Sequence, residues 1–381
     1  MIPFNKLYHG ESAIRYIIDA LSEGHLSGNG EFTRKCQMWF EENTGAKKAF
    51  LTTSGTHALE IASILIDIKE GDEVIMSSFT SPSTANAFVL RGAIPVFVDI
   101  RPDTMNIDET KIEQAITEKT RALVPMHYAG VGCEMDKIND IAKKYGLFVI
   151  EDAAHAITAK YKGKTLGTIG QIGIYSFHDT KNISCGEGGV LLINDERFIK
   201  RAEIVREKGT NRSEFFRGEV DKYTWIDVGS SYLLSELNAA VLWAQLEKIE
   251  EIQKRRKEIW NKYFYLLKPL EEMGHIELPH IPENCEHNAH IFYIKAKNLE
   301  ERQRLLDFLR QNKICATFHY IPLHSSKAGM KYGRFSGEDI YTTRESERLI
   351  RLPIFVELKE NELIYICRKI YEFYKERFIN K

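Results

Sequence analysis

The stretch that decides the fold lies at residues 147–152 and reads LFVIED. It is one of several short runs, rich in β-branched and aromatic residues, that occur between residues 46 and 195. The others read KKAFLTT, DEVIMSS, IPVFVDI, RALVPMH, IGIYSF and GGVLLIND. Helical patterns separate several of these runs, at residues 56–68, 83–91 and 135–145. Such alternation predicts an α/β fold with a mostly parallel central sheet and helices on both faces.

The chain changes character after Tyr232, where a long helical pattern runs through residue 267. The run KRRKE within it is interpreted as an exposed helix face rather than a basic recognition patch. Beyond the helix we expect a strand at 290–296, a helix at 301–311 and a strand at 315–322. The sequence therefore predicts a large α/β domain over residues 1–248, which includes the N-terminal segment, and a smaller α+β domain over 249–381.

The composition excludes several classes of protein. Lys and Arg number 52 and Asp and Glu number 54, so the formal charge is -2 and no broad field attracts nucleic acid or an anionic membrane. The chain has no run of about 18 apolar residues, and its start, MIPFNKLYHG, lacks the features of a signal peptide. We therefore expect a cytoplasmic protein that binds neither nucleic acid nor membrane.

The cysteines and histidines give no sign of a metal or redox centre. The six cysteines are far apart and form no CxxC pair, which favours reduced thiols over disulfides or zinc ligands. His287 and His290 are three residues apart, but no carboxylate or cysteine stands at a supporting distance. No metal site is predicted.

Three segments at the ends of expected strands carry candidate chemistry, because ligands bind there in open α/β sheets. The first is Ser54-Gly55-Thr56 at the start of a helix. Free N–H groups and the helix dipole at such a position suit a phosphate. An isolated segment of this kind is more often an ordinary helix cap.

The second segment is the end of the 147–152 strand, which carries Glu151 and Asp152 and, one turn on, His155. An acid here suits a cationic ring nitrogen, and the histidine suits an adjacent oxygen. A capping aspartate with a satisfied core histidine explains the same residues equally well.

The third segment is SFHDTKN at 176–182, followed by GEGG at 186–189. Aromatic and small neighbours would depress the pKa of Lys181 and make it a nucleophile able to form a Schiff base, although a lysine after a strand is usually solvated. The glycines fit a tight turn rather than a Walker loop, because the lysine precedes them. Phosphate donors, an acid and such a lysine are together what pyridoxal phosphate requires of a protein.

The chain resembles the DegT/DnrJ/EryC1/StrS sugar aminotransferases over essentially its whole length. The motifs that carry the resemblance are SGTHALE, EDAAHA, SFHDTKN, GEGG and HYIPLH. The resemblance implies a pyridoxal-phosphate-dependent transferase of fold type I, active as a homodimer whose sites are shared across the interface. Stretches at 101–110, 206–225 and 337–349 are similar to members that aminate C4 of dTDP-4-keto-6-deoxy-D-glucose with L-glutamate. Such members make dTDP-4-amino-4,6-dideoxy-D-galactose and 2-oxoglutarate, in pathways such as those of enterobacterial common antigen and O-antigen.

The resemblance also assigns roles to residues. It makes Lys181 the catalytic lysine that bonds the cofactor, Asp152 the partner of the ring nitrogen and His155 the neighbour of the ring hydroxyl. It matches three phosphate ligands, which are Gly55, Thr56 and Ser176.

The chain departs from the family pattern at two cofactor positions. Relatives carry a stacking aromatic in a motif like SYTFVSTAN, whereas residues 78–86 here read SFTSPSTAN. Ser81 replaces that aromatic, and Phe79 is the remaining candidate for stacking on the cofactor. Ser231 stands where many relatives have an asparagine that reaches the phosphate of the neighbouring subunit.

For the nucleotide sugar, the candidate binding segments are 212–223 and 319–324, with Arg212, Tyr320 and His324 as the candidate residues. The histidines of the second segment are equally compatible with ordinary loop or core positions.

Other functions remain open at this point. The same fold supports amination at C3 of a related dTDP-keto sugar, or a C4 product of the gluco epimer. A sugar dehydratase of the same scaffold carries histidine in place of the lysine, so Lys181 disfavours it. The intact pair of Asp152 and Lys181 disfavours a non-catalytic protein that binds or senses sugar nucleotides.

Overall fold

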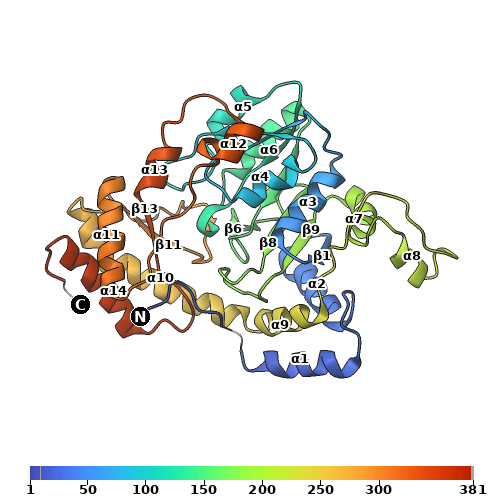
Figure 1. Ribbon diagram of the computed structural model, residues 1–381, viewed down its shortest axis with the longest axis horizontal. Coiled ribbons are helices and arrows are strands. Elements are labelled where there is room, and N and C mark those ends of the chain that lie inside the picture. Colours follow the sequence, from blue (N-terminus) through green and yellow to red (C-terminus); the bar gives the residue numbers. More distant parts are fainter. Residues whose placement is uncertain (9, 379–381) are drawn as a thin grey trace.

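The computed structural model describes residues 1–8 and 10–378 and is built on one large sheet (Figure 1). Its strands follow the order β1-β9-β8-β5-β4-β2-β3-β12. The pairs from β8 to β12 are parallel, whereas β9 is antiparallel to both its neighbours. The strands are β1 (Lys48–Thr52), β2 (Glu73–Ser77), β3 (Ile94–Val98), β4 (Thr120–Val124), β5 (Phe148–Asp152), β8 (Ile172–Ser176), β9 (Gly189–Ile193) and β12 (Arg334–Phe335). The predicted α/β fold with a mostly parallel sheet is confirmed.

Both faces of this sheet are covered because its strands are apolar on both sides. In β9, Val190 and Leu192 pack into one core, and Leu191 and Ile193 into the other, as the two-residue period of a strand requires. The first core is covered by α2 (Glu31–Thr44), α6 (Met135–Tyr145) and α9 (Glu236–Leu246). The second is covered by α3 (Gly55–Leu65), α4 (Pro82–Val89) and α7 (Ile199–Arg206).

The C-terminal part of the chain has a core of its own. It contains α10 (Ile249–Glu272), β11 (Phe292–Lys295), α11 (Leu299–Gln311), β13 (Leu349–Leu352) and α14 (Glu360–Phe373). Strands β11 and β13 pair antiparallel. The long helical pattern after Tyr232 forms two helices, because α9 ends at Leu246 and α10 begins at Ile249. The division of the chain at residue 248 stays a prediction.

The strand expected at 315–322 is wrong. Thr317 makes a single bridge to Arg351, but the segment forms no continuous strand. Its period-two pattern is interrupted at Tyr320, whose φ of 32° lies in the left-handed region, and Pro322 follows. The chain then returns to the large sheet, where β12 pairs with β3.

The remaining elements are short or peripheral. They are α1 (Ser12–Glu23), η1 (Glu109–Lys111), α5 (Ile112–Ala115), η2 (Tyr128–Gly130), β6 (Lys160–Tyr161), β7 (Lys164–Thr165), η3 (Glu196–Phe198), α8 (Arg212–Phe216), β10 (Cys285–Glu286), η4 (Leu323–Ser325), α12 (Lys327–Tyr332) and α13 (Thr342–Arg348). Helix α1 lies along α9 (Figure 1). No helix in the described part of the chain is both long and apolar enough to cross a bilayer.

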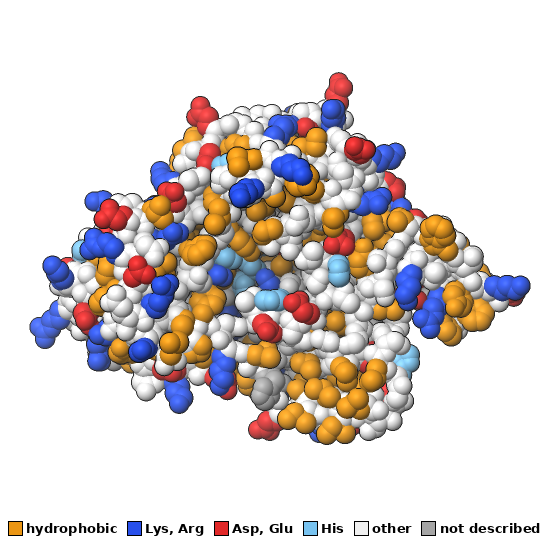
Figure 2. Space-filling view, viewed as in Figure 1, with side chains coloured by type: hydrophobic (Ala, Val, Ile, Leu, Met, Phe, Trp, Pro, Cys, Tyr) orange, Lys and Arg blue, Asp and Glu red, His pale blue; other side chains and the backbone are white. Residues whose placement is uncertain are grey.

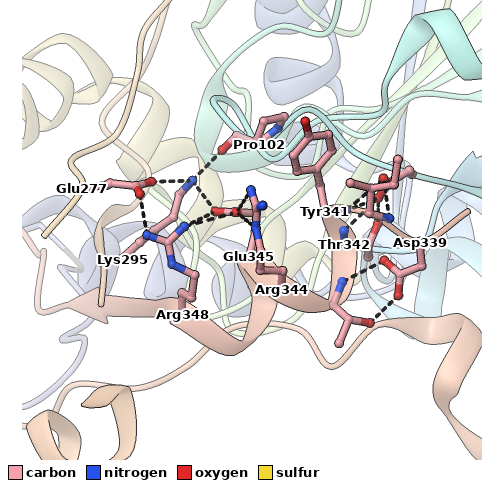
Figure 3. Close-up of polar contacts among 12 residues, drawn as sticks. Pro102, Glu277, Lys295, Asp339, Tyr341, Thr342, Arg344, Glu345 and Arg348 are labelled. Atoms are coloured by element: carbon pink, nitrogen blue, oxygen red, sulfur yellow. Dashed lines mark hydrogen bonds and ion pairs between the residues drawn. The ribbon is translucent and has the colours of Figure 1, made fainter. Parts of the chain in front are cut away.

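A buried ionic clamp fastens α13 to its surroundings (Figure 3). Glu345 lies 2.7 Å from Lys295 of β11 and 3.2 Å from Arg348, and Lys295 also donates to the carbonyl of Pro102 at 2.5 Å. At the start of α13, the carboxylate of Asp99 accepts hydrogen bonds from three consecutive backbone N–H groups. Because Asp99 directly follows β3, the clamp holds the C-terminal part against the edge of the large sheet.

Candidate active site

A cavity of about 400 Å³ lies where β1, β5 and β8 end, at the edge of the sheet shared by the carboxyl ends of parallel strands. Figure 2 shows a hollow in the middle of this face, with histidine and basic side chains inside it. The part of the chain built on the large sheet contributes Ser54, Gly55, Thr56, Ser81, Ser83, His155, Ser176 and Lys181 to the lining. The C-terminal part contributes Arg256, His290, His319, Tyr320 and Arg351.

One end of the cavity is the N-terminus of α3. Ser54 caps this helix by accepting the N–H of His57 at 3.1 Å, and Gly55 is its first residue. A Cβ at Gly55 would lie 2.9 Å from the Cβ of Ser176, so only glycine allows this close approach. Thr56 donates its hydroxyl to Ser83 at 2.9 Å. Free N–H groups, a helix dipole and several hydroxyls thus converge at a point suited to a phosphate.

The two carboxylates at the end of β5 have different surroundings. Glu151 is fully buried and accepts four hydrogen bonds, from the N–H groups of Gly167, Ile169 and Gly170 at 2.6–2.8 Å and from His127 at 2.9 Å. Asp152 accepts the hydroxyl of Thr84 at 2.6 Å, and its charge acts on Lys181. Successive residues of a strand face opposite sides, so one carboxylate stabilises the fold and the other is available to a ligand.

Lys181 lies in the loop after β8, and its N–H donates to the carbonyl of His178 at 2.9 Å. Burial lowers the pKa of its amine to about 8, Asp152 acts in the opposite direction, and Arg351 lowers the pKa further. The next residue, Asn182, is held by His290, whose Nδ1 lies 2.7 Å from its Oδ1. The loop therefore presents a fixed amine that is partly neutral near physiological pH.

A lysine of lowered pKa, a buried acid and a phosphate-binding helix start occur together in a known group of enzymes. Residues 8–371 match the DegT/DnrJ/EryC1/StrS aminotransferase family. The chain belongs to this family.

Individual members are similar over nearly their whole length. The uncharacterized protein MJ1066 of Methanocaldococcus jannaschii is 36% identical, with 96% of each chain covered. The spore coat polysaccharide biosynthesis protein SpsC of Bacillus subtilis is 30% identical, with 98% of this chain and 97% of SpsC covered. Among solved structures, the PMP-form of the putative sugar aminotransferase Spr1654 from Streptococcus pneumoniae superposes with a TM-score of 0.89 at 26% identity, covering 98% of this chain and 99% of that one.

Most of the site residues expected from the family motifs lie together. Gly55, Thr56, His155, Ser176, Lys181 and Tyr320 line the cavity, and Asp152 lies beside it. His155 lies against His290, with ring centroids 4.2 Å apart. Burial holds the pKa of both imidazoles well below the usual range, and the charge of Lys181 adds to the effect. Both rings are therefore neutral hydrogen-bonding groups.

Four further candidates lie elsewhere in the single chain. Phe79 is buried behind the cavity wall, with its ring edge-on to Tyr320 at 5.4 Å, so it supports Tyr320 and does not line the cavity. Arg212 and Ser231 line a different cavity of about 670 Å³, where the guanidinium of Arg212 packs on Phe216. His324 lies 2.7 Å from the hydroxyl of Ser78 and 3.1 Å from the carboxylate of Asp339.

Several cavity residues carried no recognisable sequence signal. Arg256 belongs to the run interpreted as an exposed helix face, yet it is buried and donates to the carbonyls of Ala289, His290 and Ile354. The exposed-face interpretation is therefore wrong at Arg256. Arg351 lies in β13, about 170 residues after Lys181, and nothing in its local sequence marks it as a site residue.

Proposed function

We propose that this family member is a pyridoxal-phosphate-dependent aminotransferase that transfers the amino group of L-glutamate to the keto carbon of a nucleotide sugar. One observation carries the proposal: Lys181, with a pKa lowered to about 8 and subject to the charge of Asp152, lines the same cavity as Gly55, Thr56 and the other polar groups at the start of α3. A reactive amine, an acid and a phosphate-binding helix start in one cavity are the groups that this cofactor requires.

The residues present fit pyridoxal phosphate. Gly55, Thr56 and Ser176 would hold its phosphate, Asp152 would pair with its ring nitrogen, and Lys181 would bond it covalently. Once bound, the cofactor supplies an electron sink for the carbon that loses or gains a proton. SpsC and the Spr1654 enzyme, whose names refer to polysaccharide biosynthesis and to sugar amino transfer, support the choice of a sugar substrate.

In this mechanism Lys181 moves the proton. As a neutral amine it accepts a proton from the α-carbon of the amino donor, and as an ammonium it returns a proton. A pKa near 8 leaves both protonation states accessible around neutral pH. The hydroxyl of Thr84 and the N–H of Ala154 fix the carboxylate of Asp152, which would stabilise a positive charge on the ring nitrogen of the cofactor.

A second cavity of about 700 Å³ adjoins the first and shares His319, Tyr320 and Arg351 with it. Its other walls are largely apolar and include Phe97, Phe318, Ile321, Leu323 and Tyr332. An apolar recess of this size suits a nucleoside, while the sugar extends past Tyr320 toward Lys181. This neighbourhood supports the 319–324 segment as part of the sugar-nucleotide site.

Within this class we propose dTDP-4-keto-6-deoxy-D-glucose as the acceptor and dTDP-4-amino-4,6-dideoxy-D-galactose as the product. The support is the similarity of residues 101–110, 206–225 and 337–349 to the enzymes that make this product. We further propose a cytoplasmic homodimer in which Arg212 and Ser231, both exposed and absent from the lining of their own chain's Lys181 cavity, act in the partner's site.

The test is a two-step spectroscopic assay on the purified holoenzyme. L-Glutamate should abolish the visible absorption of the bound cofactor, and the keto sugar should restore it. NMR of the product then reads the position and configuration of the new amine, which separates C4 from C3 and the galacto from the gluco epimer. Turnover by a Lys181→Ala variant, or no spectral response of the wild-type protein to any amino acid, would contradict the proposal.

A further inference from the structure

His290 is a cavity residue whose imidazole is held at one nitrogen and open at the other. Its Nδ1 lies 2.7 Å from the Oδ1 of Asn182, and the same amide donates from its NH₂ group to the backbone carbonyl of Asn288, at 2.8 Å. Because a carbonyl can only accept, the orientation of the Asn182 amide is fixed, and its Oδ1 needs a donor. The Nδ1 of His290 therefore carries the ring proton.

The other nitrogen of His290 is consequently a hydrogen-bond acceptor. Burial and the charge of Lys181 hold the pKa of the imidazole well below its usual range, so the ring is neutral and has a single N–H. His290 is only 6% exposed and lines the cavity, and no residue among 1–8 and 10–378 donates to its Nε2. A buried lone pair of this kind is unfavourable unless a ligand or a neighbouring side chain donates to it.

His155 offers the cavity the opposite group. Its ring centroid lies 4.2 Å from that of His290, but its Nδ1 accepts the N–H of Ala129, at 3.4 Å. Burial keeps this ring neutral as well, so its proton is on Nε2. The two neighbouring imidazoles therefore differ in tautomer, since the Nε2 of His155 is a donor and the Nε2 of His290 is an acceptor.

Lys181 is the donor that suits this acceptor. Apart from burial, the charge of Lys181 has the largest effect on the pKa of both His155 and His290, so the amine lies near the two rings. Of these two rings, only His290 can accept a hydrogen bond from it. The amine lines the same cavity and makes no hydrogen bond or ion pair with any residue of the described ranges, 1–8 and 10–378. An unpaired donor and an unpaired acceptor thus share one cavity.

We propose that His290 is a positioning residue for Lys181: its Nε2 accepts an N–H of the free amine and turns the lone pair of that amine toward the amino donor. The inference rests on the proposed function, since it names the group that orients the base of that reaction. A neutral imidazole suits this task better than a carboxylate, whose negative charge would hold the lysine in its protonated form. The imidazole keeps its own proton on Nδ1, so the α-proton moves only from the donor carbon to the nitrogen of Lys181.

The backbone of His290 is fixed in a way that holds the ring in this direction. Its N–H donates to the Oδ1 of Asn288 at 3.2 Å, and its carbonyl accepts from Arg256 at 2.8 Å. Asn288 in turn donates to the carbonyls of His155 and Ile157, both at 2.8 Å. The acceptor is therefore placed by groups from α10 and from the loop after β5, independently of the loop that carries the lysine.

The experiment compares three variants of the holoenzyme. His290→Asn places an amide nitrogen close to the position of Nδ1, so it keeps the contact with Asn182 and removes the acceptor. His290→Gln places its amide close to the position of Nε2 and loses the contact with Asn182. His287→Asn is the control, because His287 lies in the same segment and its ring also packs against another, that of Trp260, with centroids 4.4 Å apart, yet it lines neither cavity.

Rapid-mixing absorbance gives the apparent Kd for L-glutamate and the maximal rate of the spectral change, with the α-carbon of the donor carrying either hydrogen or deuterium. Two further measurements use the cofactor-free protein. Urea denaturation reports stability, and nitrogen NMR of protein labelled at histidine Nδ1 separates a protonated ring nitrogen from one with a lone pair. The NMR signal that is missing from His290→Asn belongs to His290.

We expect His290→Asn to lower the maximal rate by about 10- to 100-fold and to increase the deuterium isotope effect, because a misdirected base slows only the proton transfer. Its apparent Kd for glutamate should stay within about twofold of the wild-type value, and its urea midpoint should not change. His290→Gln should show the reverse, with a rate closer to wild type and a lower urea midpoint, because the Oδ1 of Asn182 loses its donor. The NMR signal of His290 should be that of a protonated Nδ1.

A wild-type rate in His290→Asn, an equal loss in His290→Gln, or an equal loss in His287→Asn would overturn the inference. An unprotonated Nδ1 in His290 would overturn it too. So would a loss of glutamate affinity with the rate unchanged, because His290 would then contact the donor itself. If the wild-type holoenzyme responds to no amino acid, the proposed function fails, while the NMR of the cofactor-free protein still tests the tautomer of His290.

Discussion

Substitutions of the two neighbouring carboxylates of β5, Glu151 and Asp152, should have different effects, the first on the stability of the fold and the second on turnover. Glu151→Gln changes one oxygen of a buried carboxylate into an NH₂ group. His127 accepts the N–H of Cys133 at its Nδ1, so its Nε2 carries the proton donated to Glu151. Gly167 donates to the same carboxylate oxygen, whereas Ile169 and Gly170 donate to the other. Whichever way the amide turns, two of the four donors meet an NH₂ group instead of an oxygen.

Hydrogen bonds to a charged group contribute about 1.5–3 kcal/mol each, so the loss of two costs about 3–6 kcal/mol. This is a large part of the roughly 5–15 kcal/mol that stabilises a typical protein. Asp152→Asn is the matched control. Its amide still accepts from Ala154 and donates to Thr84, whose hydroxyl can turn toward Thr80, 2.9 Å away. This second variant should keep its stability to within about 1 kcal/mol.

Urea denaturation of the two cofactor-free variants, beside the wild type, measures the difference. Turnover should show the reverse order, because Asp152→Asn removes the negative charge that we propose pairs with the ring nitrogen, and kcat should fall by about 10²–10³-fold. A Glu151→Gln protein as stable as wild type would refute the assignment of Glu151 to the fold. An Asp152→Asn protein with wild-type kcat would refute the assignment of Asp152 to the cofactor.

Three other outcomes follow from the structure. The pKa of Lys181 is lowered to about 8, so its amine is mostly neutral only above that pH. The rate at which the cofactor-free protein captures pyridoxal phosphate should therefore rise about tenfold per pH unit below pH 8 and level off above it. A rise that continues to pH 10.5 would contradict the lowered pKa. Gly55→Ala places a methyl group 2.9 Å from the Cβ of Ser176, and fluorescence titration should show cofactor affinity reduced about 10-fold in a protein that still folds. Glu345→Gln leaves the buried Lys295 with only the longer ion pair to the exposed Glu277, at 3.6 Å, and should cost about 3 kcal/mol in urea denaturation, whereas Glu347→Gln, exposed on the same helix, should cost almost nothing.

The large sheet could be predicted from the sequence because its signals are local. Each long strand is a largely apolar run, and each candidate catalytic residue lies at the end of its strand or a few residues after it, as Asp152 and Lys181 do. Strand β12 could not be predicted, since it has only two residues and its partner β3 lies more than 230 residues earlier. Its place depends on the clamp at Asp99 and Glu345, which forms only when the chain is folded.

The difference between local signals and long-range contacts also explains why the sequence did not identify some of the cavity residues. Lys181 stands in a motif, whereas Arg351 and His290 enter the cavity only because the β11–β13 pair is packed over the sheet. The spacing of His287 and His290 is compatible with a metal pair, but the Nδ1 of His290 lies 2.7 Å from the amide oxygen of Asn182, next to Lys181. A contact between residues 108 positions apart has no signature in a single sequence.

The charge of the cavity depends on the burial of its histidines as well as on the number of its basic residues. A chain with a net charge of -2 gathers Lys181, Arg256 and Arg351 around one cavity, together with the three buried histidines His155, His290 and His319. If those imidazoles were protonated, each positive charge would lower the pKa of Lys181 further and deprive it of the ability to hold a proton. Burial keeps them neutral, so the cavity stays attractive to anions while its lysine remains a usable base. Polar substitutions that admit water to the histidines should therefore impair proton transfer even where they leave every group that contacts the cofactor in place.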